Sequence, residues 1–176
     1  MSVFDNLIKN KIKETNEIID ALTIDEFKKK QVRNNWLDSI ILMEHLTSKH
    51  YKTYNYLNII TIVGGILIPV VINVIPNTHL CSTLVTTFLG VTVSVATGIN
   101  QSYRFNDRWR HFRLIAEELK IEGERFFALG EKYQTFTSHE NEAFKLFMTN
   151  VESIKENQID TFMKKVIKSD SKQSEK

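Results

Sequence analysis

The sequence predicts an all-α membrane protein, in which a two-transmembrane helical hairpin continues through long helices into a cytoplasmic helical bundle. Residues 53–103 contain no Lys, Arg, Asp or Glu, although 25% of the 176 residues are charged. Two apolar blocks, 57–75 and 80–99, occupy this stretch, and as helices each is about 30 Å long, the thickness of a bilayer's hydrocarbon core. Apolar residues at helical spacing on both sides of the stretch predict helices there as well.

A pair of buried helices in a soluble protein is the competing interpretation. Two all-apolar helices without a polar face would need a larger surrounding domain than 176 residues supply, so the membrane hairpin is favoured. The chain carries 23 basic and 21 acidic residues, a balance that argues against a nucleic-acid partner. We therefore expect transmembrane helices over 57–75 and 80–99, with membrane lipid as a partner.

Basic residues around the hairpin predict its orientation. Lys49 and Lys52 precede the first block and arginines follow the second, whereas the turn 76–79 has no Lys or Arg. The positive-inside rule then places both termini in the cytoplasm and the hairpin in the inner (plasma) membrane. Four tyrosines at the inner boundary suit the headgroup layer: Tyr51, Tyr54, Tyr56 and Tyr103. The single cysteine, Cys81, is expected to be a small packing residue.

The segment before the hairpin is expected to be helical. Residues 1–22 mix apolar and charged positions, which predicts an N-terminal helix or a partner-docking arm. Thr23 and Glu26 have the spacing of a capping box, so a cytoplasmic helix is predicted over 25–56, leading into the membrane with a break near 52–55. Trp36 lies on its apolar face.

A cytoplasmic helix over 101–134 is expected to continue from the second transmembrane helix. Its apolar positions follow a 4–3 spacing typical of coiled-coil packing: Phe105, Trp109, Phe112, Ala116, Leu119, Gly123, Phe126, Gly130 and Tyr133. The opposite face is expected to be solvated and carries Glu117, Glu118, Lys120, Glu122, Glu124 and Arg125. A second capping box, Thr137 to Glu140, predicts a C-terminal helix over 139–167, followed by a disordered tail at 168–176.

Small and polar residues form a strip along the second transmembrane helix, at spacings of four and three residues. Its members are Thr83, Thr87, Gly90, Ser94, Thr97 and Gln101. Such spacing places them on one side of a helix. The strip either lines a hydrated path in an oligomer or packs against a neighbouring helix. Small and polar residues also recur in the first span (Asn58, Thr61, Gly65, Pro69 and Asn73), where a packing face is the favoured interpretation.

The arginine cluster after the second span has two interpretations. Its members are Arg104, Arg108, Arg110 and Arg113, with His111 beside them. It either meets anionic lipid headgroups, which its juxtamembrane position favours, or binds an anionic ligand such as a nucleotide. The five histidines lack metal-ligand spacing, and no phosphate-binding loop or nucleophile–base arrangement occurs in the sequence. We therefore expect no enzyme activity, no metal and no cofactor.

Several segments resemble the bacterial SLATT family of two-transmembrane proteins, which includes a large group of domains of unknown function. The resemblance covers roughly residues 25–135. It rests on Arg33-Asn34-Asn35-Trp36, on IITIVGGILIPVVI in the first span, on Gln101 to Trp109, and on the Trp109–Phe127 segment. SLATT membership implies an effector that forms pores or perturbs membranes in prokaryotic conflict systems, some of which signal with nucleotides. We expect no fused nucleotide-synthesising or nucleotide-sensing domain in these 176 residues, so sensing would require these helices or a separate protein.

These observations lead to two functional hypotheses. In the first, the chain is an oligomeric, pore-forming effector of a bacterial antiphage system, because two transmembrane helices alone cannot enclose a path. The polar strip of the second span would line the pore, and five aromatic residues would hold the oligomer and relay the trigger: Trp36, Phe105, Trp109, Phe112 and Phe126. In the second, the hairpin anchors a non-conducting adaptor or docking platform for a partner protein.

Overall fold

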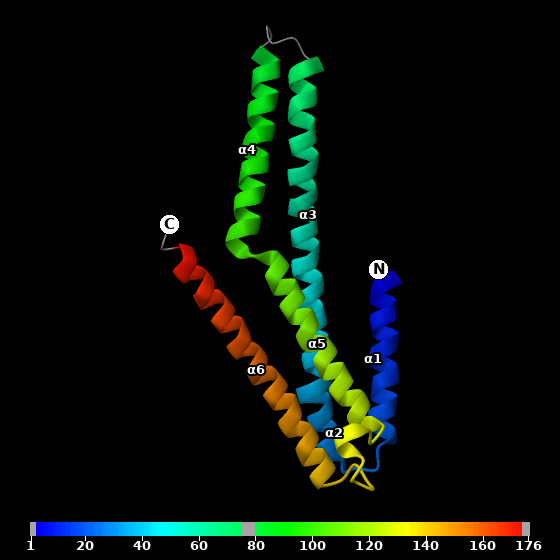
Figure 1. Cartoon of the computed structure of the whole chain (residues 1–176). Helices are drawn as coiled ribbons and strands as arrows, with labels where there is room; N and C mark the ends of the chain where they lie inside the picture. Colours follow the sequence, from blue (N-terminus) through cyan, green and yellow to red (C-terminus); the bar gives the residue numbers. More distant parts are fainter. Residues whose placement is uncertain (1–2, 75–79, 174–176) are drawn as a thin grey trace. The chain divides into compact units, whose positions relative to one another are not determined.

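The computed structural model describes residues 3–74 and 80–173, and every regular element within them is helical (Figure 1). The predicted turn, 76–79, lies outside the described residues, as does the side chain of Cys81. In chain order the elements are α1 (Val3–Ala21), α2 (Glu26–Val32), the π-helix η1 (Arg33–Leu37), α3 (Asp38–Val74), α4 (Leu80–Tyr103), α5 (Phe105–Phe127), the 3₁₀-helix η2 (Glu131–Tyr133) and α6 (Glu142–Gln173). The all-α prediction is confirmed.

The chain forms two compact units, and the helices α3 and α5 each contribute residues to both. The bundle unit comprises residues 1–44 and 113–176, and the hairpin unit comprises residues 45–112. The predicted helix 25–56 is therefore divided among α2, η1 and α3, and α3 runs without interruption through the break expected near 52–55. Since no Gly or Pro occurs between residues 26 and 63, nothing in the sequence ends the helix there.

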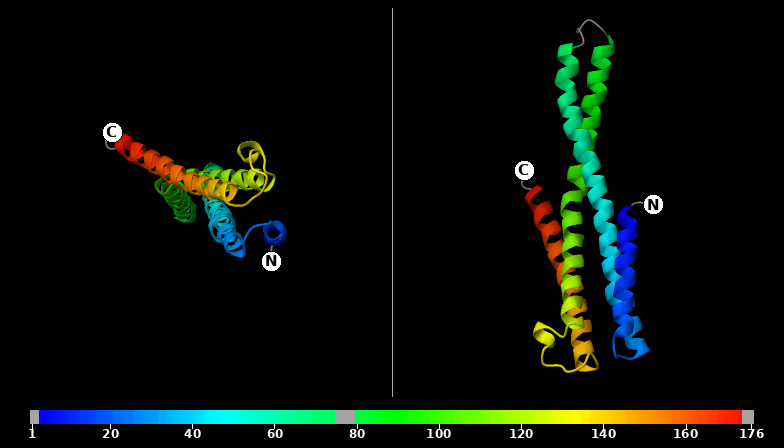
Figure 2. Two further views of the ribbon diagram at one scale, coloured as in Figure 1. Left: turned by 90° about the horizontal axis from the view of Figure 1, so that it is seen from below. Right: turned by 90° about the vertical axis from the view of Figure 1, so that its right-hand side faces the viewer.

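The core of the bundle unit is built from apolar faces of several helices. Its largest fully buried side chains are Ile19, Val32, Leu119, Phe126, Tyr133, Phe147 and Val151. Within this unit α6 lies along α5 (Figure 2), and the rings of Phe126 and Phe147 stack with centroids 4.3 Å apart. Leu119, Phe126 and Tyr133 of this core belong to the apolar 4–3 spacing that the sequence predicted for residues 101–134.

Both predicted capping boxes are wrong. Helix α2 begins at Glu26, after Asp25, and no side chain caps it. Helix α6 begins at Glu142, three residues beyond the predicted start, and continues to Gln173 into the predicted tail. The helix starts only after Asn141, whose left-handed φ of 48° is not helical. The ring of His139 lies 5.2 Å from Phe126, and its Nε2 is 3.1 Å from the carbonyl oxygen of Phe127.

The predicted continuous helix over 101–134 is also interrupted. Helix α4 ends at Tyr103 and α5 begins at Phe105, because Arg104 adopts a left-handed conformation with φ of 48°. The Asp107 carboxylate accepts hydrogen bonds from Arg104 Nε at 3.0 Å and Nη2 at 2.7 Å. The Asp107 backbone N–H also donates to the Arg104 carbonyl at 3.1 Å. Asp107 thus holds the turn between the two helices.

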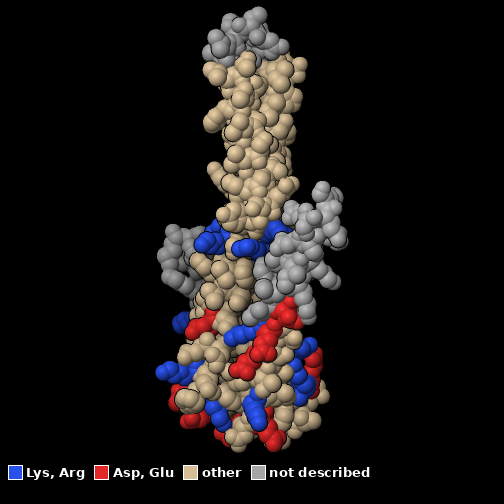
Figure 3. Space-filling view, turned by 90° about the vertical axis from the view of Figure 1, so that its left-hand side faces the viewer, with Lys and Arg blue, Asp and Glu red and all other residues tan. Residues whose placement is uncertain are grey.

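Two helices are long and apolar enough, by length and composition, to cross a membrane. They correspond to α3 with the segment preceding it, and to α4. Only about 6% of each apolar window is buried, and the remaining residues are exposed or half-buried in a single chain. Figure 3 shows the corresponding uncharged surface in tan on the face displayed.

Candidate functional site

In the hairpin unit, α3 and α4 contact each other through small residues. A Cβ atom added to Gly64 would lie 2.4 Å from Val93 Cγ2, and Ala96 is buried at 4% exposure. The hydroxyls of Thr61 and Thr97 are 3.4 Å apart. Close approach of this kind is typical of membrane helix pairs. Thr61 of the expected packing face of α3 is therefore at the contact. The glycine at the contact is Gly64 and not the expected Gly65, where an added Cβ atom would meet nothing within 4 Å.

The polar strip of α4 lies mostly beside this contact rather than in it. Thr83, Thr87, Ser94 and Gln101 are exposed, Gly90 is half-buried, and half-buried Thr97 reaches α3 through Thr61. At 100° per residue, the strip occupies a different side of α4 from Ala96 and Val93. A third side is apolar and exposed, with Phe88 at 73% and Val95 at 54%. The intrachain helix contact thus leaves most of the strip uncovered.

Two kinds of polar group occur along the strip. Thr87 donates to the Thr83 carbonyl at 2.7 Å, and Thr97 donates to the Val93 carbonyl at 2.8 Å, so their hydroxyls are satisfied within α4. Among the described residues, no side-chain hydrogen bond is made by Ser94 or Gln101. In an apolar surrounding, these two groups need water or another protein chain as a partner.

An aromatic cluster connects α3 to the start of α5 within the hairpin unit. The imidazole of His50 stacks on Phe112 at 5.5 Å and lies 5.8 Å from Phe105, and Tyr51 meets Trp109 edge-on at 5.4 Å. Burial lowers the pKa of His50, and the positive charges of Arg108 and Lys49 lower it further. Three of the five predicted aromatic residues therefore form one cluster: Phe105, Trp109 and Phe112.

The other two, Trp36 and Phe126, lie in the core of the bundle unit. Trp36 sits on the π-helical turn η1, its ring is 5.2 Å from Phe127, and a Cβ atom at Gly123 would come within 2.1 Å of its Cζ2. Its indole N–H donates to the Leu119 carbonyl at 2.6 Å. The five aromatic residues thus form two groups, one in each unit.

The four predicted arginines also have different surroundings. Arg104 pairs with Asp107 at 2.7 Å, and Arg113, in the bundle unit, is 3.9 Å from Glu117. The guanidinium of Arg110 lies 5.6 Å from the Trp109 ring centroid. In the part of the chain that the structure describes, neither Arg108 nor Arg110 pairs with a carboxylate. The quartet is therefore not a single convergent cluster.

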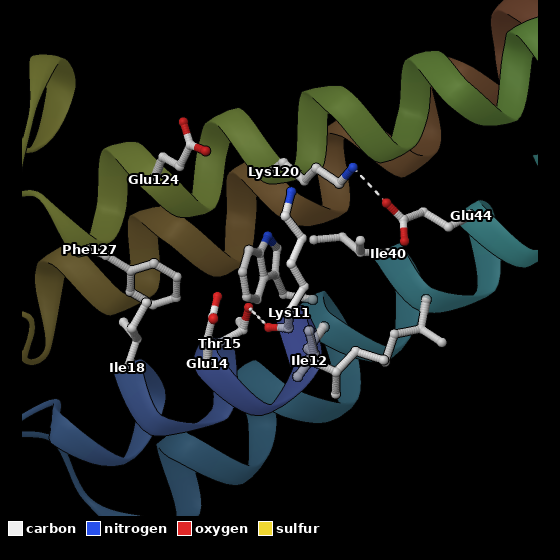
Figure 4. Close-up of a pocket in the computed structure, with 13 residues that line it drawn as sticks. Lys11, Ile12, Glu14, Thr15, Ile18, Ile40, Glu44, Lys120, Glu124 and Phe127 are labelled. Atoms are coloured by element: carbon white, nitrogen blue, oxygen red, sulfur yellow. Dashed lines mark hydrogen bonds and ion pairs between the residues drawn. The ribbon is translucent and has the colours of Figure 1, made fainter. Parts of the chain in front are cut away.

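A cavity of about 540 Å³ opens beside Trp36 in the bundle unit (Figure 4). Ile12 and Ile18 of α1 lie on one side, and Leu37, Ile40 and Phe127 complete its apolar wall. The Lys120 amine and the Glu44 carboxylate form an ion pair of 2.6 Å at one end, while Lys11, Glu14 and Glu124 supply charges of both signs at its edge. The volume is in the range of small-molecule sites, but the mixed charges select neither an anion nor a cation.

A buried carboxylate, Glu122, joins three elements of the bundle unit. It is 2% exposed and accepts hydrogen bonds from Tyr133 Oη at 2.5 Å and Asn150 Nδ2 at 2.8 Å, and its other oxygen is 2.9 Å from Lys132 Nζ. Burial raises the pKa of this carboxyl, but these partners outweigh burial and hold it below its ordinary value. Burial and the Glu122 carboxylate raise the pKa of Tyr133.

The prediction that Glu122 lies on a solvated face is therefore wrong. Its position relative to Leu119 and Phe126, three residues after one and four before the other, places it on the inward face of α5. The sequence contained that signal, but the neighbouring charges at 117–125 obscured it. Among residues 3–74 and 80–173, no group of three or more His, Cys, Asp or Glu side chains is placed to hold a metal ion.

Comparisons with known proteins identify a family but no characterised relative. No curated protein and no solved structure gives a significant match to the chain. One family model matches residues 34–141, more than half of the chain, and covers both apolar helices and the aromatic cluster. The chain therefore belongs to the family described as "Protein of unknown function (DUF4231)".

Proposed function

We propose that this chain is a non-enzymatic protein of the inner (plasma) membrane that oligomerises to form a pore, with the polar strip of α4 along the conducting path. The observation that carries the proposal is the exposure of Thr83, Thr87, Ser94 and Gln101 on a side of α4 that α3 does not cover. A strip of this kind in an apolar surrounding is stabilised by water or by another copy of the helix.

The division of α4 into three sides supports an oligomer. One side packs on α3 at Ala96, the apolar side around Phe88 suits lipid, and the strip is left for a central path. Because two helices cannot enclose a path, several copies have to contribute α4. Both termini would lie in the cytoplasm, since the basic residues flank the open end of the hairpin.

The resemblance to SLATT proteins supports a biological role for such a pore. We propose that the chain is an effector of a bacterial conflict or antiphage system, in which ion leakage through the membrane harms the infected cell. The trigger would come from a separate sensor protein or from a nucleotide signal, with the aromatic residues of both units relaying it.

Ion flux through liposomes that contain the purified full-length chain tests the pore. The double variant Thr87→Leu, Ser94→Leu replaces two polar groups on the strip and should abolish flux while the oligomer persists by native mass spectrometry. The matched control, Phe88→Leu with Val95→Leu, changes two residues on the exposed apolar side and should retain flux. Flux that is unchanged in the Thr87, Ser94 variant would contradict the assignment of the strip.

A second result would favour the adaptor. If the wild-type chain inserts and oligomerises but gives no flux under any condition, including added nucleotides or cell extract, the strip is a helix–helix contact. Disulfide crosslinking between cysteines introduced at Ser94 in neighbouring copies would then be efficient in the silent oligomer.

A further inference from the structure

Charge is distributed unevenly between the two units. Five of the 23 basic residues but only one of the 21 acidic residues lie in the hairpin unit, residues 45–112. The acidic residue is Asp107, and it is occupied by Arg104 at 2.7 Å. All five basic residues border the uncharged stretch 53–103, and on the face displayed in Figure 3 basic residues adjoin the tan surface.

Four of these cations remain without a carboxylate partner among the described residues. Lys49 and Lys52 belong to α3, and Arg108 and Arg110 belong to α5. Burial lowers the pKa of His50 most, and the positive charges of Arg108 and Lys49 lower it further. Arg108 and Lys49 therefore lie near the same imidazole. The aromatic contacts of His50 with Phe105 and Phe112 hold the two helices together there.

The directions of these cations distinguish between the two ligands that the sequence left open, anionic lipid headgroups and a soluble anion such as a nucleotide. Arg108 and Arg110 are two residues apart on a helix, which turns them about 200° from each other. The cavity beside Trp36 is not lined by any of the four cations, and neither is a smaller cavity of about 330 Å³ beside Glu122 in the bundle unit. Because Arg108 and Arg110 point in different directions, the four cations do not all converge on a single soluble anion, but they suit a layer of phosphates that surrounds the hairpin.

The neighbouring side chains fit the same layer. Tyr51 and Trp109 meet edge-on at 5.4 Å, and Arg110 lies over the Trp109 ring. Aromatic rings with a polar edge favour the membrane–water boundary, and basic residues next to it attract anionic headgroups. The set of cations that can meet anionic headgroups therefore differs from the predicted one. It gains Lys49 and Lys52, and it loses Arg104 and Arg113, which have carboxylate neighbours.

We propose that Lys49, Lys52, Arg108 and Arg110 form a basic collar that binds the phosphate groups of anionic phospholipids in the leaflet at the open end of the hairpin. This inference rests on the proposed membrane insertion but not on conduction. The collar would fix the depth of the hairpin and give the protein a preference for anionic membranes.

Lipid retention by the full-length protein tests the collar. The protein is purified from nanodiscs that contain equal amounts of phosphatidylglycerol and phosphatidylcholine, and retained lipids are counted by native mass spectrometry. The wild type should retain phosphatidylglycerol preferentially. The triple variant Lys49→Gln, Arg108→Gln, Arg110→Gln should lose preference by about fivefold for each cation removed. The matched control, Lys13→Gln, Lys30→Gln, Lys145→Gln, removes the same charge from exposed positions of the bundle unit and should keep the preference.

Further arms separate the possible outcomes. Arg108→Lys with Arg110→Lys keeps the charge and should keep the preference, which guards against a triple variant that fails to fold. Equal retention of both lipids by the wild type, or loss of preference only in the control, would overturn the collar. Saturable binding of glycerol phosphate or inorganic phosphate to the detergent-solubilised protein would show that the collar binds a soluble phosphate and not a phospholipid headgroup. Flux in liposomes reports on the pore independently, and absence of any retained lipid would count against membrane insertion itself.

Discussion

The indole N–H of Trp36 donates a 2.6 Å hydrogen bond to the backbone carbonyl of Leu119, a residue 83 positions later in the chain. This bond joins the π-helical turn η1 to α5 inside the bundle unit, and Trp36 is only 4% exposed. A π-helical turn is rare in proteins and is often found at functional sites. Here it presents the indole to Leu119 and to the cavity wall at the same time.

Replacing Trp36 with Phe should destabilise the bundle unit. The change removes the hydrogen bond to Leu119 and part of a ring that contacts Phe127 and Phe147, with an expected cost of about 1–3 kcal/mol. Chemical unfolding in detergent, followed by circular dichroism, would measure the loss. Phe27→Leu is the control because Phe27 is 66% exposed, and an equal loss in both variants would argue against a specific role for Trp36.

Gly123→Ala should also destabilise the protein, although alanine favours helices. The added Cβ would lie 2.1 Å from Trp36 Cζ2 and 2.6 Å from Cε2, so a rigid buried ring has to move. The expected cost is about 1–3 kcal/mol. Gly130→Ala, where nothing lies within 4 Å, is the control. The double variant Gly123→Ala, Trp36→Phe should lose less stability than the sum of the losses in the two single variants, because the smaller ring leaves room for the added Cβ. A loss equal to that sum would show that the two residues are not coupled.

Acid should weaken the network around Glu122. Because the pKa of Glu122 lies below its ordinary value of 4.5, its contribution to stability is complete above that value and is lost as the pH falls from about 4.5 through the lowered pKa. Glu122→Gln should lower the free energy of unfolding at pH 7 by about 1–3 kcal/mol and remove this part of the acid dependence. Unfolding between pH 7 and 3 would show both effects, with exposed Glu124→Gln as the control. Parallel pH profiles for wild type and Glu122→Gln would contradict the assignment.

Adjacent glycines in the first apolar helix should respond differently to substitution. Gly64→Ala would place a Cβ 2.4 Å from Val93 Cγ2 and should push α3 and α4 apart, whereas Gly65→Ala meets nothing within 4 Å. We expect a loss of about 1–3 kcal/mol at Gly64 and no loss at Gly65. Thermal unfolding in detergent compares the two, and Val93→Ala should restore stability to Gly64→Ala. Equal tolerance of alanine at both positions would mean that α3 and α4 do not approach at Gly64.

The all-helical character and the position of the two apolar helices followed from the sequence because both depend on local patterns. An uninterrupted uncharged stretch of helical length and the spacing of apolar residues around Trp36, Leu119 and Phe126 are properties of the chain itself. The helix starts were less predictable. Thr23 and Thr137 both begin a capping-box pattern, yet neither begins a helix.

The remaining features depended on contacts between distant residues. Glu122 resembles its charged neighbours until Tyr133, Lys132 and Asn150 converge on it, since a buried carboxylate is stable only with such partners. Likewise, Gly64 and Gly65 are equivalent in the sequence, and only the approach of Val93 distinguishes them. The sequence by itself determined which segments are helical and apolar, because secondary structure follows local periodicity. The tertiary structure decided which polar residues are buried, paired or left exposed, because that depends on which other helix faces them.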